Sequence, residues 1–219
     1  MIGAVFNAVV YDPIYNGLVF FVGALPTHDM GIAVIIVTIL VRIVLYPLSK
    51  SAIKAQMKMK EVAPEIEELK KRLKDKPEEQ SKAIFALYKE REVKPFSGFL
   101  LILIQLPILL GLYWVFAMGG LPEINAEILY SFVSVPSAVN MEFLGLIDMS
   151  GRSIVLAVLA TIAQFVYTRL SMGPRGEKTA TEASFSSDMA RSFDLQARYM
   201  LPVMVGVIAF FIAAAAPLY

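Results

Sequence analysis

The sequence predicts an all-α membrane protein, a small bundle of transmembrane helices with a polar groove inside the membrane and an antiparallel helical hairpin in the cytoplasm. Of its 219 residues, 57% are hydrophobic, and the mean hydropathy of +0.64 is too high for a soluble domain of this length. Four apolar segments are long enough to cross about 30 Å of hydrocarbon at about 1.5 Å per residue. The basic residues are concentrated in two of the segments between them.

The four predicted spans are residues 31–48 (TM1), 98–118 (TM2), 152–171 (TM3) and 199–217 (TM4). Residues 4–25 are a weaker candidate, because Asp12, Pro13 and Asn16 interrupt the apolar run. The aromatic side chains of this stretch suit the headgroup region, so we favour an interfacial amphipathic helix within an extracytoplasmic segment 1–30, with a span as the alternative. The first 28 residues lack the Lys and Arg of a signal peptide, so we expect a mature N-terminus.

The positions of the basic residues predict the orientation. Residues 50–94 hold 13 of the 20 Lys and Arg residues, and residues 169–198 hold 5 more, whereas 1–30 has none and 119–150 carries only acids. Cytoplasmic loops of membrane proteins are enriched in Lys and Arg. Both basic segments are therefore predicted to be cytoplasmic, and the N-terminus and the segment 119–150 extracytoplasmic.

The cytoplasmic hairpin is predicted at residues 49–95. The turn sequence "KDKP" separates two stretches in which apolar residues recur at mostly helical spacing. These residues are Ile53, Met57, Val62, Ile66, Leu69 and Leu73 before the turn, and Ile84, Leu87 and Tyr88 after it. The second cytoplasmic segment, 172–198, contains the small, polar run "GPRGEKTATEASFSSD" and is predicted to be a flexible loop.

Arg42 stands out because it lies inside the apolar run "IIVTILVRIVLYPLSKS". A central arginine costs about 2.5–3.5 kcal/mol on insertion, whereas each Val, Ile or Leu contributes about 0.3–0.6 kcal/mol in favour. The predicted span 31–48 contains twelve of these apolar residues. The span can therefore insert despite the charge, but the balance does not explain why the charge is there.

Polar residues at helical spacing predict a groove around Arg42. Thr38 precedes it by one turn, and three of the four predicted spans carry a polar stripe. The residues on the other two spans are Gln105, Tyr113 and Trp114 on 98–118, and Thr161, Gln164 and Thr168 on 152–171. We interpret the stripes as a hydrated pocket that opens toward the cytoplasm. Such a pocket lowers the cost of bringing polar groups part-way into the membrane.

Simpler roles remain open for each of these residues. Arg42 lies about 9 Å from the end of its predicted span and can reach the inner-leaflet phosphates by extending its side chain. Gln105 and Gln164 can serve as hydrogen-bonding contacts between helices, worth about 0.6 kcal/mol each.

Several of these features resemble the YidC family of membrane protein insertases, which includes the mitochondrial Oxa and chloroplast Alb proteins. The resemblance lies in the first-span arginine followed by "YPL", in the charged hairpin, and in "VKPFSGFLLILIQLPILLGLYWVF", and it continues in order to "YMLPVMVGVIAFF". It covers the chain from about residue 30 to residue 211. The asparagine that often precedes the proline of the "VKP" element is missing here.

The resemblance implies a function and a set of groove residues. It implies an insertase that moves nascent hydrophobic segments from the cytoplasm into the bilayer without nucleotide hydrolysis, in the bacterial plasma (inner) membrane. The implied groove residues are Arg42, Thr38, Gln105, Tyr113, Trp114 and Gln164. The implied partners are nascent membrane proteins, the lipid bilayer, the ribosome and the Sec translocon, with no specific recognition of nucleic acid. Family members also have a fifth span, which this sequence is expected to lack.

Two other functional classes are weighed against this one. A small solute or ion transporter is the alternative, but no inverted repeat and no second charge away from the ends of a span supports it. An enzyme is not expected: the sequence has no cysteine, no nucleotide-binding loop and no metal-ligand motif, and no cofactor is predicted. The single histidine, His28, lies beside Asp29, where we expect it to anchor or cap the first span.

Overall fold

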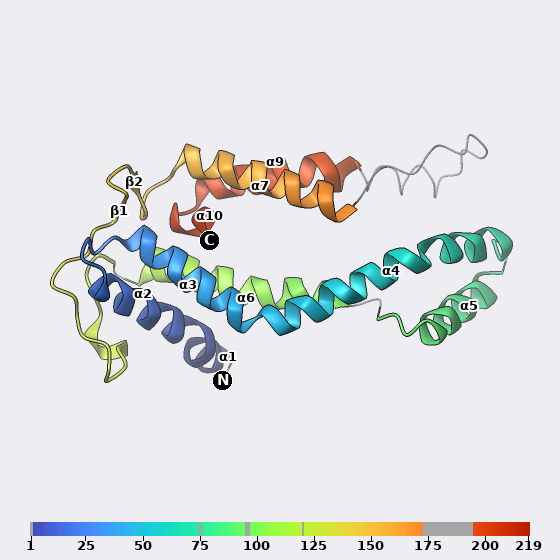
Figure 1. The fold of residues 1–219 in the computed structure, drawn as a ribbon, viewed down its shortest axis with the longest axis horizontal. Coiled ribbons are helices and arrows are strands. Elements are labelled where there is room, and N and C mark those ends of the chain that lie inside the picture. The colour runs from blue at the N-terminus through green and yellow to red at the C-terminus, as the bar shows by residue number, and fades with distance from the viewer. Residues whose placement is uncertain (1, 75, 95–96, 120, 173–194) are drawn as a thin grey trace. The chain divides into compact units, whose positions relative to one another are not determined.

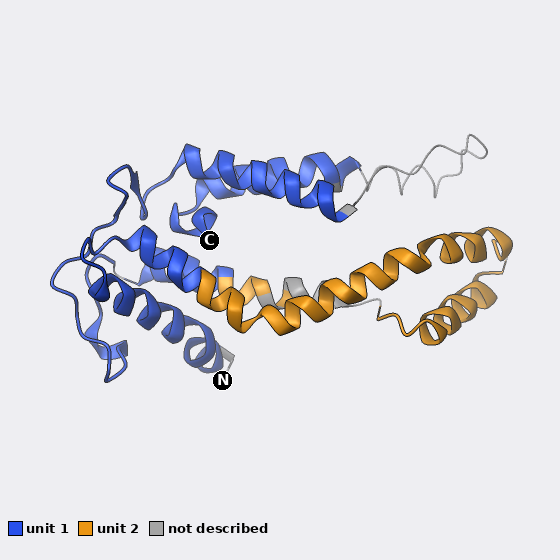
Figure 2. Cartoon of the chain, viewed as in Figure 1, with its two compact units in different colours: residues 1–38, 109–219 blue, residues 39–108 orange. Residues whose placement is uncertain are grey.

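The computed structural model describes residues 2–74, 76–94, 97–119, 121–172 and 195–219. The part of the chain that it describes is mostly helical (Figure 1). It divides into two compact units (Figure 2). Unit 1 contains residues 1–38 and 109–219, and unit 2 contains residues 39–108. The predicted flexible loop, 172–198, lies almost entirely outside the described residues.

Unit 1 begins with a nearly continuous helix made of α1 (Ile2–Phe6), a π-helical turn (Asn7–Tyr11) and α2 (Asp12–Ala24). The chain does not break at Pro13, because the proline occupies the first turn of α2 and the wider π turn precedes it. A second π turn (Gln196–Met200) precedes Pro202 in α9 (Leu201–Phe211) in the same way. In length and composition, Gly3–Ala24 qualifies as a membrane span, so its interfacial placement remains a prediction.

Helices α7 (Ile154–Met172) and α9 pack side by side in unit 1 (Figure 1). Their backbones approach closely where Gly206 of α9 meets the side chain of Thr161, since a Cβ at position 206 would overlap the threonine hydroxyl. That hydroxyl donates a hydrogen bond to the Ala157 carbonyl oxygen at 2.8 Å. A small residue opposite a threonine is typical of closely packed membrane helices.

The helix within the predicted span 199–217 ends before residue 217. Helix α9 ends at Phe211, and a short helix α10 (Ala215–Leu218) follows. Between them the backbone N–H of Ala214 bonds to the Gly151 carbonyl oxygen at 2.8 Å. This hydrogen bond to the segment before α7 replaces a bond that a continuous helix would make.

The segment between α6 (Ser97–Met118) and α7 contains few regular elements. These are a 3₁₀ turn (Ala126–Ile128) and an antiparallel hairpin of β1 (Glu142–Phe143) and β2 (Ile147–Asp148), in which Glu142 pairs with Asp148. The ring of Phe143 packs against Gly31 at the start of α3 (Met30–Val44), where a Cβ would overlap it.

The helix within the first predicted span, 31–48, is interrupted after residue 44. Helix α3 ends at Val44, α4 (Tyr46–Arg72) begins after Leu45, and the two helices meet at a bend of 63°. Pro47 explains the break, because it has no N–H to donate to the carbonyl oxygen of residue 43 and its ring clashes with that carbonyl group. Among the described residues, two helices are long and apolar enough to cross a membrane, or three if the bent pair α3–α4 is one span.

Unit 2 contains the charged hairpin, in which α4 packs against α5 (Pro77–Glu90). The buried residues that join them are Val62, Ile66, Leu87 and Val93, with Met59, Leu69, Ile84 and Tyr88 packed around them. This group is called the hairpin seam below. Ile53 and Met57 share the helical spacing of the apolar residues before the turn, but they are not part of the seam, and they are 51% and 59% exposed.

Candidate functional site: the polar residues of the spans

Arg42 lies in the last turn of α3, one turn before the bend, and its side chain is exposed. Its charge is favourably placed there, because the carbonyl groups at a helix C-terminus carry a partial negative charge. Thr38 lies one turn earlier and is half-buried. Its hydroxyl donates to the Val34 carbonyl oxygen at 2.7 Å, which satisfies the hydroxyl within its own helix.

The predicted groove residues of α6 differ in their surroundings. Gln105, in unit 2, is half-buried. In unit 1, Tyr113 is 37% exposed, whereas the Trp114 ring packs edge-on against Phe6 at 4.9 Å between centroids. Gly111 lies one turn before Trp114 on α6. It allows the N-terminal helix to approach, because a Cβ at this position would lie 2.8 Å from the Val10 side chain. Tyr113 is therefore the more accessible member of the aromatic pair.

On α7, two of the three polar residues serve internal packing. Thr161 contacts α9 at Gly206, and Thr168 is buried. Gln164 is half-buried, and its Nε2 donates to the Thr168 hydroxyl at 3.3 Å. The structure thus brings Gln164 and Thr168 together as predicted for one stripe. The groove that all six residues are predicted to form involves both units, and it remains a prediction.

The structure adds a set of polar residues at the N-terminal end of α3 that the sequence identified only in part. Asp29 is 3% exposed. Its Oδ1 accepts from the Ile32 N–H at 3.0 Å, which caps α3, and its Oδ2 accepts from the Leu144 N–H at 2.8 Å. An aspartate just before an apolar run is a known helix-start signal, but the bond to residue 144 has no sequence signal.

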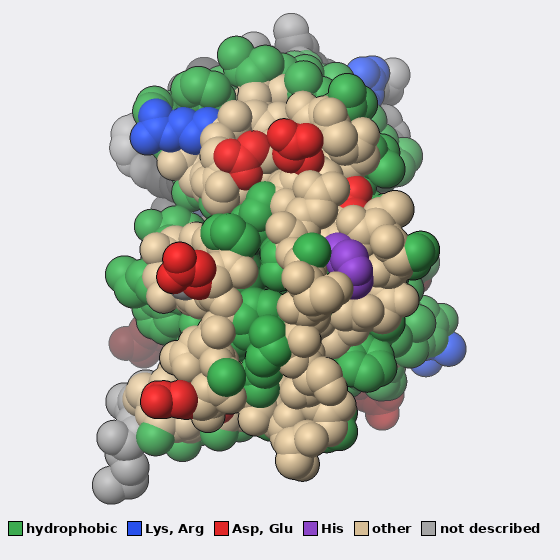
Figure 3. Space-filling model, turned by 90° about the vertical axis from the view of Figure 1, so that its left-hand side faces the viewer, with side chains coloured by type: hydrophobic (Ala, Val, Ile, Leu, Met, Phe, Trp, Pro, Cys, Tyr) green, Lys and Arg blue, Asp and Glu red, His purple; other side chains and the backbone are tan. Residues whose placement is uncertain are grey.

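His28 and Asn140 complete this connection. The backbone N–H groups of Met30 and Asn140 donate to the carbonyl oxygens of Asn140 and His28, each at 2.9 Å. The His28 ring donates from Nδ1 to the Val22 carbonyl oxygen at 2.8 Å. Acidic side chains and the histidine are visible on this face of the molecule (Figure 3). His28 thus anchors the chain before α3, as predicted, while Asp29 provides the cap.

Asn16 makes a second connection, between α2 and the segment that follows α6. It is 2% exposed and donates from Nδ2 to the carbonyl oxygens of Asp12 and Ile128, each at 2.9 Å. Its Oδ1 accepts from the Tyr130 N–H. The hydroxyl of buried Tyr15 accepts from the Asn125 N–H at 2.9 Å. Asn16 interrupts the apolar run, and the hydrogen bonds of its amide group connect α2 to the segment after α6.

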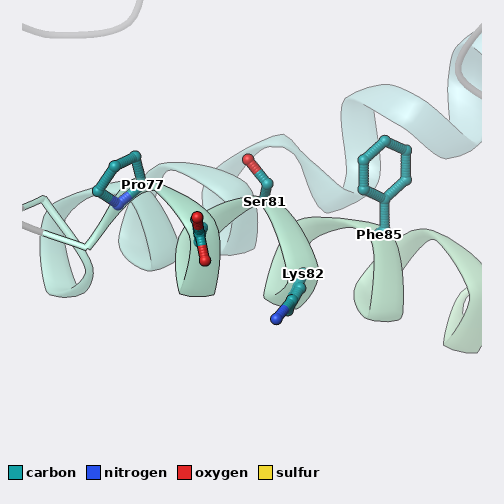
Figure 4. A pocket seen from close by; sticks show the side chains of 5 residues that line it. Pro77, Ser81, Lys82 and Phe85 are labelled. Atoms are coloured by element: carbon teal, nitrogen blue, oxygen red, sulfur yellow. The ribbon is translucent and has the colours of Figure 1, made fainter.

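One open depression lies on α5 rather than on a predicted span. It is lined by Pro77, Glu78, Ser81, Lys82 and Phe85 (Figure 4). None of the six predicted groove residues lines it. Within the described ranges, no three His, Cys, Asp or Glu residues gather in a way that could hold a metal ion.

Comparison with known proteins identifies the class. Residues 21–219 match the family described as 60Kd inner membrane protein. The chain belongs to this family, which confirms the resemblance found in the sequence. All six predicted groove residues lie within the matched range.

The relatives carry the name membrane protein insertase YidC. The chain is 30% identical to the one from Clostridium tetani over 167 residues, which are 76% of this chain and 68% of the relative. It is 33% identical to the one from Clostridium perfringens over 164 residues, 73% of this chain and 63% of the relative. For Burkholderia cenocepacia the identity is 30% over 197 residues, 87% of this chain but only 30% of the relative. The chain therefore spans about two thirds of the Clostridium proteins and less than a third of the Burkholderia protein.

Proposed function

We propose that this chain is a membrane protein insertase, which moves nascent hydrophobic segments from the cytoplasm into the inner membrane. The observation that carries the proposal is the family match over residues 21–219, together with relatives named as insertases. In this proposal the N-terminus and the segment between α6 and α7 lie outside, and the α4–α5 hairpin lies in the cytoplasm. The ribosome and the Sec translocon are proposed partners that deliver substrates to this side.

Arg42 is proposed as the fixed charge of a hydrophilic groove that includes Thr38, Gln105, Tyr113, Trp114 and Gln164. A substrate must bring a polar, often acidic, tail across the hydrocarbon, and the desolvation of such groups is the main barrier. An arginine near the cytoplasmic end of α3 attracts the tail, and polar side chains keep water in the groove. The apolar helix of the substrate then passes sideways into lipid. No bond is made or broken, so no nucleotide hydrolysis or cofactor is required.

The proposal is tested by reconstituting the chain in liposomes and measuring insertion of a single-span substrate with an acidic N-terminal tail. Arg42→Ala is expected to lower the insertion rate at least about fivefold, because one charge pair in a partly hydrated site contributes about 1 kcal/mol or more. Arg42→Lys keeps the charge and is expected to retain most of the activity.

Arg152 offers a matched control, because it is an arginine at the first residue of a predicted span, and its guanidinium lies 5.5 Å from the centre of the Phe211 ring. Arg152→Ala is expected to leave insertion unchanged. The Clostridium tetani relative serves as the positive control. If that relative inserts the substrate and the wild-type chain does not, the proposal fails for this chain. Equal activity of wild type and Arg42→Ala would contradict the role of the charge.

A further inference from the structure

The first turns of α4 carry an apolar ridge that faces away from the hairpin seam. It consists of Ile53 and Met57, which are 51% and 59% exposed. At about 100° per residue these two side chains are about 40° apart, and Val62 of the seam lies about 180° from Ile53. The ridge therefore belongs to the opposite side of α4 and cannot be covered by α5.

Lysines border this ridge. The stretch "SKSAIKAQMKMK", residues 49–60, contains four lysines and no acidic residue. Lys50 and Lys54 are exposed and lie about 60° and 100° around the helix from Ile53, along one edge of the ridge. Lys58 lies nearer to the seam, where it pairs with Glu92 at 3.8 Å. An apolar ridge next to exposed lysines is the pattern of a helix that lies in the interface of an anionic membrane.

The bend between α3 and α4 keeps the ridge at the depth of the headgroups. For an α3 that runs along the membrane normal, a bend of 63° reduces the rise of α4 along that normal from about 1.5 Å to about 0.7 Å per residue. Met57 then lies about 8 Å beyond Tyr46 along the normal, instead of about 16 Å for a straight helix. The headgroup region is about 5–8 Å thick on each side of the bilayer, so both ridge residues stay within or next to it.

We propose that residues 49–60 of α4 lie on the anionic inner leaflet, with Ile53 and Met57 at the boundary of headgroups and acyl chains and with Lys50 and Lys54 against lipid phosphates. The inference rests on the cytoplasmic side assigned to the hairpin in the proposed function. It gives this stretch a ligand of its own, the surface of an anionic lipid bilayer. The rest of α4, the seam and α5 then project from a segment that is bound to the membrane.

The absence of cysteine from the sequence allows a direct test. Single-cysteine variants of the full chain, Ile53→Cys, Met57→Cys and Ser51→Cys, are spin-labelled in nanodiscs that contain phosphatidylglycerol. Collisions of each label with oxygen, which concentrates in lipid, and with a water-soluble nickel chelate are then measured. Ser51 is the matched control, because it is exposed on α4 but lies about 160° from Ile53.

Labels at positions 53 and 57 are expected to collide more with oxygen than with nickel, and the label at 51 is expected to show the reverse. Nickel accessibility at 53 and 57 equal to that at 51 would overturn the proposal. Shielding of these labels from both agents would also overturn it, because it would mean that a protein surface covers the ridge. The readout needs no insertion activity, so an inactive chain that passes this test refutes the proposed function and leaves the lipid contact standing.

The electrostatic part is tested with Lys50→Gln and Lys54→Gln in the labelled Ile53→Cys background. Each substitution is expected to lower roughly fivefold the ratio of conformers with residues 49–60 on the lipid surface to conformers with these residues detached from it. Zwitterionic nanodiscs are expected to have a similar effect. Lys82→Gln, at an exposed position on α5, is the control and is expected to change nothing. An unchanged ratio in both α4 lysine variants would refute the contact with anionic headgroups.

Discussion

In unit 1, buried polar side chains join α2 and α3 to the segment between α6 and α7, which is called the outer segment below because the proposed function places it outside. In unit 2, by contrast, a small apolar seam and exposed ion pairs hold the α4–α5 hairpin together. In unit 1, Asn16 and Asp29 are each less than 4% exposed, and their side chains bond to backbone groups more than 110 residues away. In unit 2, the paired Arg91 and Glu65 side chains are 52% and 40% exposed.

The difference indicates how easily each region unfolds locally. A buried polar group that loses its partner is costly, so the outer segment has one well-defined arrangement. The hairpin can open by exposing few apolar side chains, and its remaining charges stay available for other contacts. This difference agrees with the proposed function, in which the hairpin lies in the cytoplasm and receives the substrates there.

The largest effect is expected for Asp29→Ala. It removes the cap of α3 and leaves the Ile32 and Leu144 N–H groups without their acceptor, which is expected to destabilise the outer segment by about 2–4 kcal/mol. Hydrogen exchange of residues 140–149 measures the change as a lower free energy of opening.

Asp29→Asn is the control, because it keeps an oxygen acceptor and is expected to cost less than the alanine variant. Exchange in the hairpin is expected to stay unchanged in both variants. Equal protection of residues 140–149 in wild type and Asp29→Ala would show that the outer segment does not depend on this joint.

The prediction from sequence succeeded where a local signal existed. Helical spacing and the "KDKP" turn predicted both hairpin helices, and an aspartate before an apolar run is a recognised cap. Pro47 also carried the signal for the end of α3, but the predicted span ran past it because the apolar character continues to residue 48. Ile53 and Met57 have the same helical spacing as the seam residues but are exposed, because periodicity along one helix does not show which of its apolar residues meet α5.

Long-range polar contacts could not be predicted. Asn16 bonds to Ile128 and Tyr130, and nothing local in either segment indicates the other. The groove depends on the same kind of information. Spacing places Thr38 and Arg42 on one face of α3, but which side chains face Arg42 from other helices is a tertiary property.

For the hairpin, Leu87→Ala is expected to have the next largest effect, about 2 kcal/mol. Leu87 is 9% exposed and is one of four buried seam residues, and a large-to-small change in so small a core lies at the low end of the usual range because the site can collapse. Hydrogen exchange in residues 46–94 is expected to accelerate while residues 121–149 stay protected.

Phe85→Ala is the matched control on the same helix. Phe85 is 66% exposed, so its removal is expected to change hairpin stability by no more than about 0.5 kcal/mol. If Leu87→Ala also loosened the outer segment, the two regions would be one cooperative unit and the comparison would fail.

A smaller effect is expected when the pair between Arg91 and Glu65 is broken by Glu65→Gln. The two side chains approach to 3.1 Å but are largely exposed, so the pair is expected to contribute less than about 1 kcal/mol and to weaken with added salt. Denaturation of the hairpin at low and high ionic strength measures this contribution. Glu79→Gln, which breaks the exposed pair with Lys76 at 3.0 Å, is expected to behave alike. If Glu65→Gln lowered the free energy of unfolding of the hairpin by much more than about 1 kcal/mol, the pair would stabilise the hairpin more than an exposed ion pair is expected to.

The smallest effect concerns the pH response of the outer segment at Asp148. The Ser150 hydroxyl, which donates to Asp148 Oδ1 at 2.7 Å, lowers the pKa of this carboxyl below its usual 3.8, and the backbone N–H groups of Ser150 and Gly151 add to the effect while partial burial opposes it. A carboxyl whose pKa is lower in the folded state stabilises it above the unfolded pKa, and this contribution is lost as the pH falls through the folded pKa. The outer segment should therefore keep its protection above the usual pKa of 3.8 and lose it as the pH falls from there through the lower folded pKa of Asp148.

Ser150→Ala separates this response from general acid unfolding. It removes the hydroxyl donor, so the folded pKa of Asp148 moves back toward its usual value and the pH dependence of exchange around β2 becomes shallower than in wild type. The hairpin, whose carboxylates lie at the surface, supplies the internal reference in the same sample. An identical pH profile in wild type and Ser150→Ala would mean that the hydroxyl does not stabilise the charged carboxylate. A shallower profile would show that a defined hydrogen bond stabilises even an exposed carboxylate of the outer segment. The hairpin differs, because its exposed carboxylates form ion pairs in solvent.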